Sequence, residues 1–300
     1  MIISSQVIKE KILFIVNPIS GKGNSQDIIE QVNFSINKSK YDVYFEVTGY
    51  KGHAYKIADH FKEKGISKII AIGGDGTVNE IGSAIINTGI SLGIIPTGSG
   101  NGLARCLSIP LNIKNAIKVL NNPEIKKIDA GKINDKYFFC NAGIGFDAHV
   151  GKVFNQTKGR GFKNYLKTII REYLRYKPKK YKLEIDGKKI SVKSFLITFS
   201  NIGQYGNNVF IAPDAKIDDG LLDVCILRPF PKLKMLSIGL RLISKTINKS
   251  KYLDVITCKE VTLKSKKKIK LHCDGESFKT INKINVKIMP ESLQVMINQQ

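Results

Sequence analysis

The 300-residue sequence has no tryptophan, and its five cysteines are scattered without a CxxC pair. Zinc sites and redox motifs need paired cysteines, so we expect reduced thiols in a cytosolic protein. No apolar run approaches the roughly 18 to 20 residues of a membrane-spanning helix. The beginning of the sequence has no basic leader before a long apolar run. We therefore expect no secretory signal and a cytoplasmic location.

Acidic residues are scarce relative to basic ones. Lys and Arg number 48 against 25 Asp and Glu, which gives a net charge of +23. The excess is concentrated in residues 176–182 and 264–270. Such a charge favours a polyanionic partner, unless the lysines are merely solvated. Because zinc-finger, RNP and KH signatures are absent, we expect an anionic membrane surface and no nucleic acid as the partner.

Strand-like and helix-like patterns alternate through residues 1–127. This alternation predicts an N-terminal α/β domain with a parallel sheet covered by helices on both faces. Ligands of such domains bind beyond the carboxyl ends of the strands. The expected strands are 11–16, 41–47, 68–72 and 91–96, each followed by a helical pattern.

Residues 128–287 have a different pattern, in which short strand-like runs are bounded by turn residues. They predict a C-terminal antiparallel β-rich domain that includes a hairpin turn at Asp186-Gly187. Two helices are expected near 161–175 and 232–246. In the second helix four apolar residues share one face: Leu233, Leu236, Leu240 and Ile243. The last residues, about 288–300, are expected to pack back on the first domain.

Three glycine-rich loops follow predicted strands of the first domain. They are NPISGKGNS (17–25), GGDGTVNE (73–80) and PTGSGNGLAR (96–105). Small residues between a strand and a helix let backbone N–H groups converge on an anion, assisted by the helix dipole. Three such loops at one sheet edge predict a phosphate or nucleotide site. The Walker, dinucleotide-binding and protein-kinase motifs are absent.

Carboxylates in glycine turns are the remaining candidates for chemistry. Asp75 can hold Mg²⁺, pin the loop, or simply belong to a turn. The segments DDGLLD (218–223) and CDGE (273–276) are either hairpin turns or sources of a metal ligand and a proton acceptor. His272 and Cys273 lack partners at metal spacing and are expected to be core or turn residues.

The motifs NPISGKG, IGGDGTVNEI, IPTGSGNGLAR, NAGIGFDAHV, DDGLLDV and CDGE, in this order, resemble the diacylglycerol kinase catalytic-domain family. That family contains bacterial lipid kinases as well as sphingosine and ceramide kinases. The resemblance implies a two-domain fold like that of NAD kinases and phosphofructokinases. It also implies ATP at the glycine loops and a lipid hydroxyl as the acceptor.

The resemblance also assigns roles to individual residues. Glu276, with Asp274 beside it, matches the proton acceptor. Asp219 matches a Mg²⁺ ligand, completed by the carbonyls of Lys216 and Leu221. A lysine at 216 contributes only its carbonyl, which leaves this site poorer in charge. The expected nucleotide contacts are Asn17, Ser20, Gly21, Lys22, Thr48, Gly73, Gly74, Asp75, Gly76, Thr77, Val78, Asn79 and Ser99.

These features together predict an ATP- and Mg²⁺-dependent lipid kinase that is cytoplasmic and peripherally associated with membranes. The expected acceptor is a primary hydroxyl of a diacylglycerol-like or long-chain-base lipid. An NAD kinase, which shares GGDG, is the enzymatic alternative. A nucleotide-binding regulatory module without catalysis is the other alternative, and a homodimer is left open.

Overall fold

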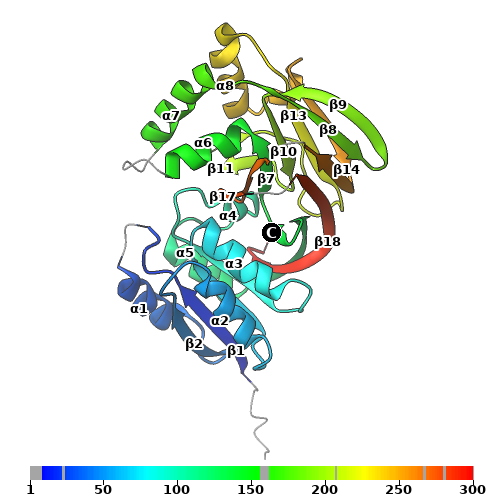
Figure 1. Cartoon of the computed structure of the whole chain (residues 1–300). Coiled ribbons are helices and arrows are strands. Elements are labelled where there is room, and N and C mark those ends of the chain that lie inside the picture. Colours follow the sequence, from blue (N-terminus) through cyan, green and yellow to red (C-terminus); the bar gives the residue numbers. More distant parts are fainter. Residues whose placement is uncertain are drawn as a thin grey trace, which may run out of the picture. The chain divides into compact units, whose positions relative to one another are not determined.

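The computed structural model describes residues 9–21, 24–155, 162–206, 208–265, 268–279 and 282–299. The chain divides into two compact units, shown in Figure 1. Unit 1 comprises Met1–Ile128 with Ser292–Gln300, and unit 2 comprises Asp129–Glu291. Within the described residues, the structure contains no helix with the length and apolar character required to cross a membrane.

Unit 1 is built on a parallel sheet, as predicted. Its strands are arranged in the order β2 (Tyr41–Val47), β1 (Glu10–Val16), β3 (Lys68–Gly73) and β4 (Ser91–Pro96). The end of β18 (Lys283–Ile297) adds a further parallel neighbour beside β4. Each of these strands is a short apolar or alternating run, because a sheet covered on both faces buries consecutive side chains.

Helices cover both faces of this sheet. Ile12, Phe14 and Val16 share a core cluster with residues of α1 and α5, whereas Leu13 and Ile15 are equally buried on the opposite face. Because side chains alternate along a strand, the second face must be covered by other helices, α2 and α3 (Figure 1). The helices are α1 (Ser25–Ser35), α2 (His53–Phe61), α3 (Asp75–Ile85), α4 (Gly102–Cys106) and α5 (Ile113–Asn121).

Unit 2 is rich in antiparallel strands, which confirms the predicted fold class. One sheet has the order β14-β13-β10-β7-β16-β17, and β18-β15-β8-β9 forms the other. Side chains from both sheets enter one core cluster, so the two sheets form a sandwich. The strands are β5 (Glu124–Ile133), β6 (Lys136–Phe138), β7 (Asn141–Gly145), β8 (Lys179–Ile185), β9 (Lys188–Ser194), β10 (Leu196–Ser200), β11 (Gln204–Gly206), β12 (Val209–Phe210), β13 (Leu222–Leu227), β14 (Leu253–Cys258), β15 (Glu260–Lys264), β16 (Lys270–Cys273) and β17 (Glu276–Lys279).

Three helices accompany the strands of unit 2. They are α6 (Phe146–Asn155), α7 (Phe162–Arg175) and α8 (Met235–Ile243). A second core cluster joins them to the sheet through Phe146, Tyr173 and Ile238. The hairpin turn between β8 and β9 has positive φ at Asp186 and Gly187, as predicted for this dipeptide.

Candidate functional site

The three glycine loops of unit 1 leave the carboxyl ends of β1, β3 and β4. These ends are adjacent, because Val16 is in register with Ile72 and Gly73 with Pro96. Side chains tie the loops together. Asn17 Nδ2 donates to Thr77 Oγ1 over 3.0 Å, and the hydroxyls of Ser20 and Thr97 are 2.9 Å apart. The loops therefore form one bonded structure.

Glycines 74 and 98 allow two of these loops to touch. A Cβ on Gly98 would lie 2.6 Å from Gly74 Cα, and a Cβ on Gly74 would lie 3.1 Å from Gly98 Cα. Both distances are shorter than an ordinary van der Waals contact. The side chains are thus missing because one loop backbone packs on the other. Gly98 was not identified from the sequence, although it lies in a loop that was.

Asp75 is the first residue of α3, and its carboxylate reaches the third loop. Its Oδ1 accepts a hydrogen bond of 2.6 Å from the Gly102 amide at the start of α4. Gly100 leaves room for the carboxylate, since a Cβ there would lie 2.6 Å from Oδ2. Burial raises the pKa of Asp75, while amide hydrogen bonds from Gly102 and Asn101 act in the opposite direction. Asp75 therefore pins the loop, and its binding of Mg²⁺ stays a prediction.

The start of α3 faces the same edge of the sheet. Gly74 occupies the N-cap position without a side-chain hydrogen bond to the helix. The first amides of a helix lack intrahelical acceptors, so uncapped ones bind anions well. Several side chains of this segment serve the fold. Thr77 and Val78 are buried, and Glu80 accepts hydrogen bonds from the amides of Gly52 and Ala54 at the start of α2.

The other predicted nucleotide contacts differ in their surroundings. Thr48 is buried, and its amide donates to the carbonyl of Val16 at the end of β1. Ser99 is exposed at the tip of the third loop, and Asn79 accepts a 3.5 Å bond from Ser83. Lys22 lies outside the described residues.

The two candidate proton acceptors of unit 2 have different environments. Asp274 is in the turn between β16 and β17, where its carboxylate accepts from the amides of Phe139, Cys140 and Asn141 at 2.9, 2.9 and 3.0 Å. Glu276 is the first residue of β17, is half-buried and is in register with Cys273. Asp274 therefore holds a loop, whereas Glu276 begins the strand β17 that follows the turn.

A buried polar chain lies next to this turn and was not predicted. His272 Nε2 is 2.8 Å from Asp147 Oδ2, and Thr198 donates to the same oxygen over 3.3 Å. The Thr198 hydroxyl also bonds to the phenol of Tyr205. Gly143 makes room, because a Cβ there would lie 2.6 Å from both His272 Nε2 and Asp147 Oδ2. His272 was expected to be a core or turn residue and is buried, but its hydrogen-bond partner Asp147 was missed.

The acidic turn at 216–221 contains the predicted metal ligands. Asp219 Oδ1 accepts a 3.0 Å bond from the Leu221 amide. The fully buried Asp129 accepts from Gly220 and Glu291, and burial raises its pKa, with Asp219 adding to the effect. No group of three His, Cys, Asp or Glu among the described residues could hold a metal. One carboxylate with backbone carbonyls fits only a largely hydrated Mg²⁺.

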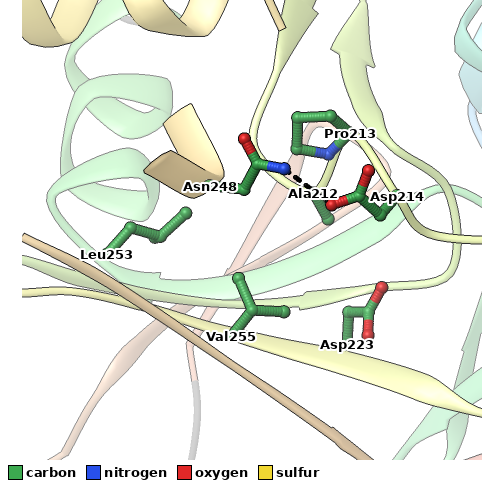
Figure 2. A pocket seen from close by; sticks show the side chains of 7 residues that line it. All are labelled: Ala212, Pro213, Asp214, Asp223, Asn248, Leu253 and Val255. Atoms are coloured by element: carbon green, nitrogen blue, oxygen red, sulfur yellow. Dashed lines mark hydrogen bonds between the residues drawn. The ribbon is translucent and has the colours of Figure 1, made fainter. Parts of the chain in front are cut away.

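A separate hollow of about 220 Å³ in unit 2 contains two carboxylates. Figure 2 shows Asp214, bonded to Asn248 Nδ2 over 2.7 Å, and Asp223 on the opposite wall. Burial raises the pKa of Asp223. Asp223 belongs to the candidate segment 218–223, but none of the residues to which a role was assigned lines this hollow, so we do not include it in the candidate site.

Comparisons with known proteins agree with this architecture. Residues 11–133 match the diacylglycerol kinase catalytic domain, and residues 141–297 match the YegS C-terminal NAD kinase beta sandwich-like domain. The chain is 29% identical over 274 residues to the diacylglycerol kinase of Mycobacterium tuberculosis (strain CDC 1551 / Oshkosh), covering 88% of this chain and 86% of the relative. It is 28% identical over 277 residues to the diacylglycerol kinase of Bacillus subtilis (strain 168), covering 87% and 88%.

Solved structures show the same fold. A diacylglycerol kinase from Bacillus anthracis str. Sterne superposes with a TM-score of 0.73 at 22% identity, over 96% of this chain and 97% of that one. A second structure from the same strain has a TM-score of 0.81 at 26% identity, with the same coverage. The fold and the matches to kinase families and kinase relatives together place this chain in the class of kinases. The chain belongs to the diacylglycerol kinase catalytic domain family, as its motifs predicted.

Proposed function

We propose that the protein transfers the γ-phosphate of ATP to a hydroxyl group of a diacylglycerol-like or long-chain-base lipid. The observation that carries this proposal is the uncapped start of α3 inside three loops that are bonded to one another. The relatives from Mycobacterium tuberculosis and Bacillus subtilis, both named diacylglycerol kinase, support a lipid acceptor.

The phosphates would bind to backbone groups of unit 1. The first amides of α3 and its dipole favour negative charge, and the loop packing holds these amides in place before ATP arrives. Thr77 and Asp75 act indirectly, since their side chains fasten the loops to one another. Lys22, from the first loop, would add positive charge. This arrangement binds phosphate mainly through main-chain donors.

Mg²⁺ would neutralise phosphate oxygens during the transfer. Asp219 and the carbonyls of Lys216 and Leu221 would hold it, and most of its remaining ligands would be water. The neighbouring Asp129 keeps this turn in shape by accepting from the amides of Gly220 and Glu291.

Glu276 is our choice for the group that takes the proton from the acceptor hydroxyl. A general base gives up hydrogen bonds at the oxygen that takes the proton. Both oxygens of Asp274 already accept backbone N–H groups, and losing these bonds would release residues 139–141. Asp274 is therefore a positioning residue that shapes the turn before Glu276.

The function is tested by incubating the purified protein with labelled ATP, Mg²⁺ and one acceptor at a time. The acceptors are a water-soluble short-chain diacylglycerol, a long-chain base, the total lipid extract of the host and NAD. We expect label in a lipid product and none in NAD. Label in NAD alone would make the protein an NAD kinase, and ATP binding without any product would make it a regulatory module.

A further inference from the structure

An apolar stripe runs along the outside of α8. Its four side chains are exposed by 95%, 73%, 59% and 58%: Leu233, Leu236, Leu240 and Ile243. Leu233 precedes the helix in a single 3₁₀ turn, and the spacing of three, four and three residues places all four on one side. Figure 1 shows α8 at the periphery of unit 2, in yellow.

The stripe is not what holds α8 to the protein. Met235, Ile238 and Leu242 form a second apolar face, which packs into the core cluster of Tyr173 and Phe195. A surface helix needs only one apolar face, and the other is normally polar. Exposed apolar surface of this extent on a folded domain indicates contact with a partner.

Positive charge surrounds the stripe. The stretch 228–251 contains seven basic residues and no acidic one: Arg228, Lys232, Lys234, Arg241, Lys245, Lys249 and Lys251. A shallow hollow of about 570 Å³ beside the helix is lined by Leu236 and Leu240 of the stripe together with Arg241 and Lys249. Acids also contact this stretch: Asp254 pairs with Arg228 over 2.6 Å, and Asp214 accepts a hydrogen bond from Asn248.

We propose that α8 is a membrane-docking element whose apolar stripe inserts into an anionic bilayer while the surrounding lysines contact lipid phosphates. Apolar residues that project from a basic helical surface are typical of such interfacial helices. A second copy of the chain fits less well, because a symmetric contact would bring the same basic residues together. This inference rests on the proposed function, which requires access to a lipid acceptor.

Vesicle cosedimentation measures the docking without any catalysis. The parent should bind vesicles that contain phosphatidylglycerol far better than pure phosphatidylcholine vesicles, and added salt should weaken binding. Each leucine at the acyl boundary contributes about tenfold in affinity. The triple variant Leu233→Ser, Leu236→Ser, Leu240→Ser should therefore bind about 1,000-fold more weakly.

Charge is tested in the same assay. Each basic residue at an anionic surface contributes about fivefold, so Lys232→Gln, Lys234→Gln, Lys249→Gln should lose roughly 100-fold on anionic vesicles. The matched charge control removes three exposed lysines of β9 that lie outside both basic clusters of the sequence: Lys188→Gln, Lys189→Gln, Lys193→Gln. Phe34→Ser, at a side chain exposed by 92% on α1, is the apolar control. Both controls should bind vesicles like the parent.

Kinase assays separate this inference from the proposed function. On the soluble short-chain diacylglycerol the leucine variant should match the parent, whereas on vesicle-embedded lipid it should lose activity together with binding. Parent-like vesicle binding by this variant would overturn the docking proposal and leave the kinase assignment standing. A parent that binds vesicles but phosphorylates no lipid would overturn the kinase assignment and leave the docking proposal standing. If the parent is a dimer that the leucine substitutions dissociate, the stripe is a self-association surface and the proposal is wrong.

Discussion

Removal of the side-chain charge should affect different properties of the protein at Asp274 and at Glu276. Asp274→Asn should mainly lower stability, because the side chain holds three backbone amides. Glu276→Gln keeps the size of the side chain and removes its basicity, so it should mainly lower the turnover number. The two substitutions are matched, since each replaces one carboxylate oxygen by an NH₂ group, and the two residues are only two positions apart.

The magnitude for Asp274 follows from its hydrogen bonds. Bonds to a charged group are each worth about 1.5–3 kcal/mol, and bonds between neutral groups about 0.5–1.5 kcal/mol. In the variant two amides keep a neutral acceptor, while the third faces an NH₂ donor and loses its bond. The free energy of unfolding should therefore fall by about 3.5 to 6 kcal/mol, which lowers the thermal midpoint by about 7 to 24 °C.

The magnitude for Glu276 follows from its proposed role as a general base. Such a base contributes about 10² to 10⁴ in rate, so the turnover number of Glu276→Gln should fall by that factor. Stability is followed by circular dichroism during urea unfolding, because the chain has no tryptophan. Activity is measured on short-chain diacylglycerol at a temperature where both variants are folded. An Asp274→Asn variant with parent-like stability, or a fully active Glu276→Gln, would refute the division of roles.

Two further predictions concern the glycine loops. Gly98→Ala should destabilise unit 1 by about 1–3 kcal/mol in urea unfolding and weaken ATP binding, because its Cβ would overlap Gly74. The control is Gly239→Ala, which should be as stable as the parent because its Cβ meets no atom within 4 Å. Burial raises the pKa of Asp75 above its usual value of 3.8, so the folded state binds this proton more tightly than the unfolded state. The parent should then lose stability relative to Asp75→Asn as the pH rises from about 3.5 to 7, and a pH-independent difference would contradict this.

Local patterns predicted most elements of unit 1, because its strands are short apolar runs separated by helical periodicity. The helix α5 was not among the predicted elements. It has a strong apolar face, but it follows a short loop rather than a strand, so the expected alternation of strands and helices did not include it. In unit 2, β7 and the first half of α6 lie within NAGIGFDAHV, where two glycines obscure any periodicity. Glycine is required here because distant residues pack closely against the backbone, as His272 does at Gly143, and such contacts cannot be read from the local sequence.

The glycine loops could be found from the sequence because each follows a strand directly. Their internal bonds could not, since Asn17 and Thr77 are 60 residues apart and Ser20 and Thr97 are 77 apart. The same holds for the carboxylates of unit 2. Asp274, a candidate proton acceptor, also bonds to amides more than 130 residues away. Local patterns identify candidate catalytic and binding residues. Only long-range contacts show which of these side chains also hold the fold through hydrogen bonds.

The helix α8 shows the same limit for apolar residues. Its sequence contains two sets at helical spacing, one with Leu236 and Leu240 and the other with Ile238 and Leu242, and periodicity alone cannot rank them. Packing decides, because only the second set faces the core. Removing exposed leucines from a surface should cost the fold little, since they bury no area there. Their presence on a helix surrounded by lysines therefore indicates a role outside the folded chain, which is the reason to look for that role at a membrane.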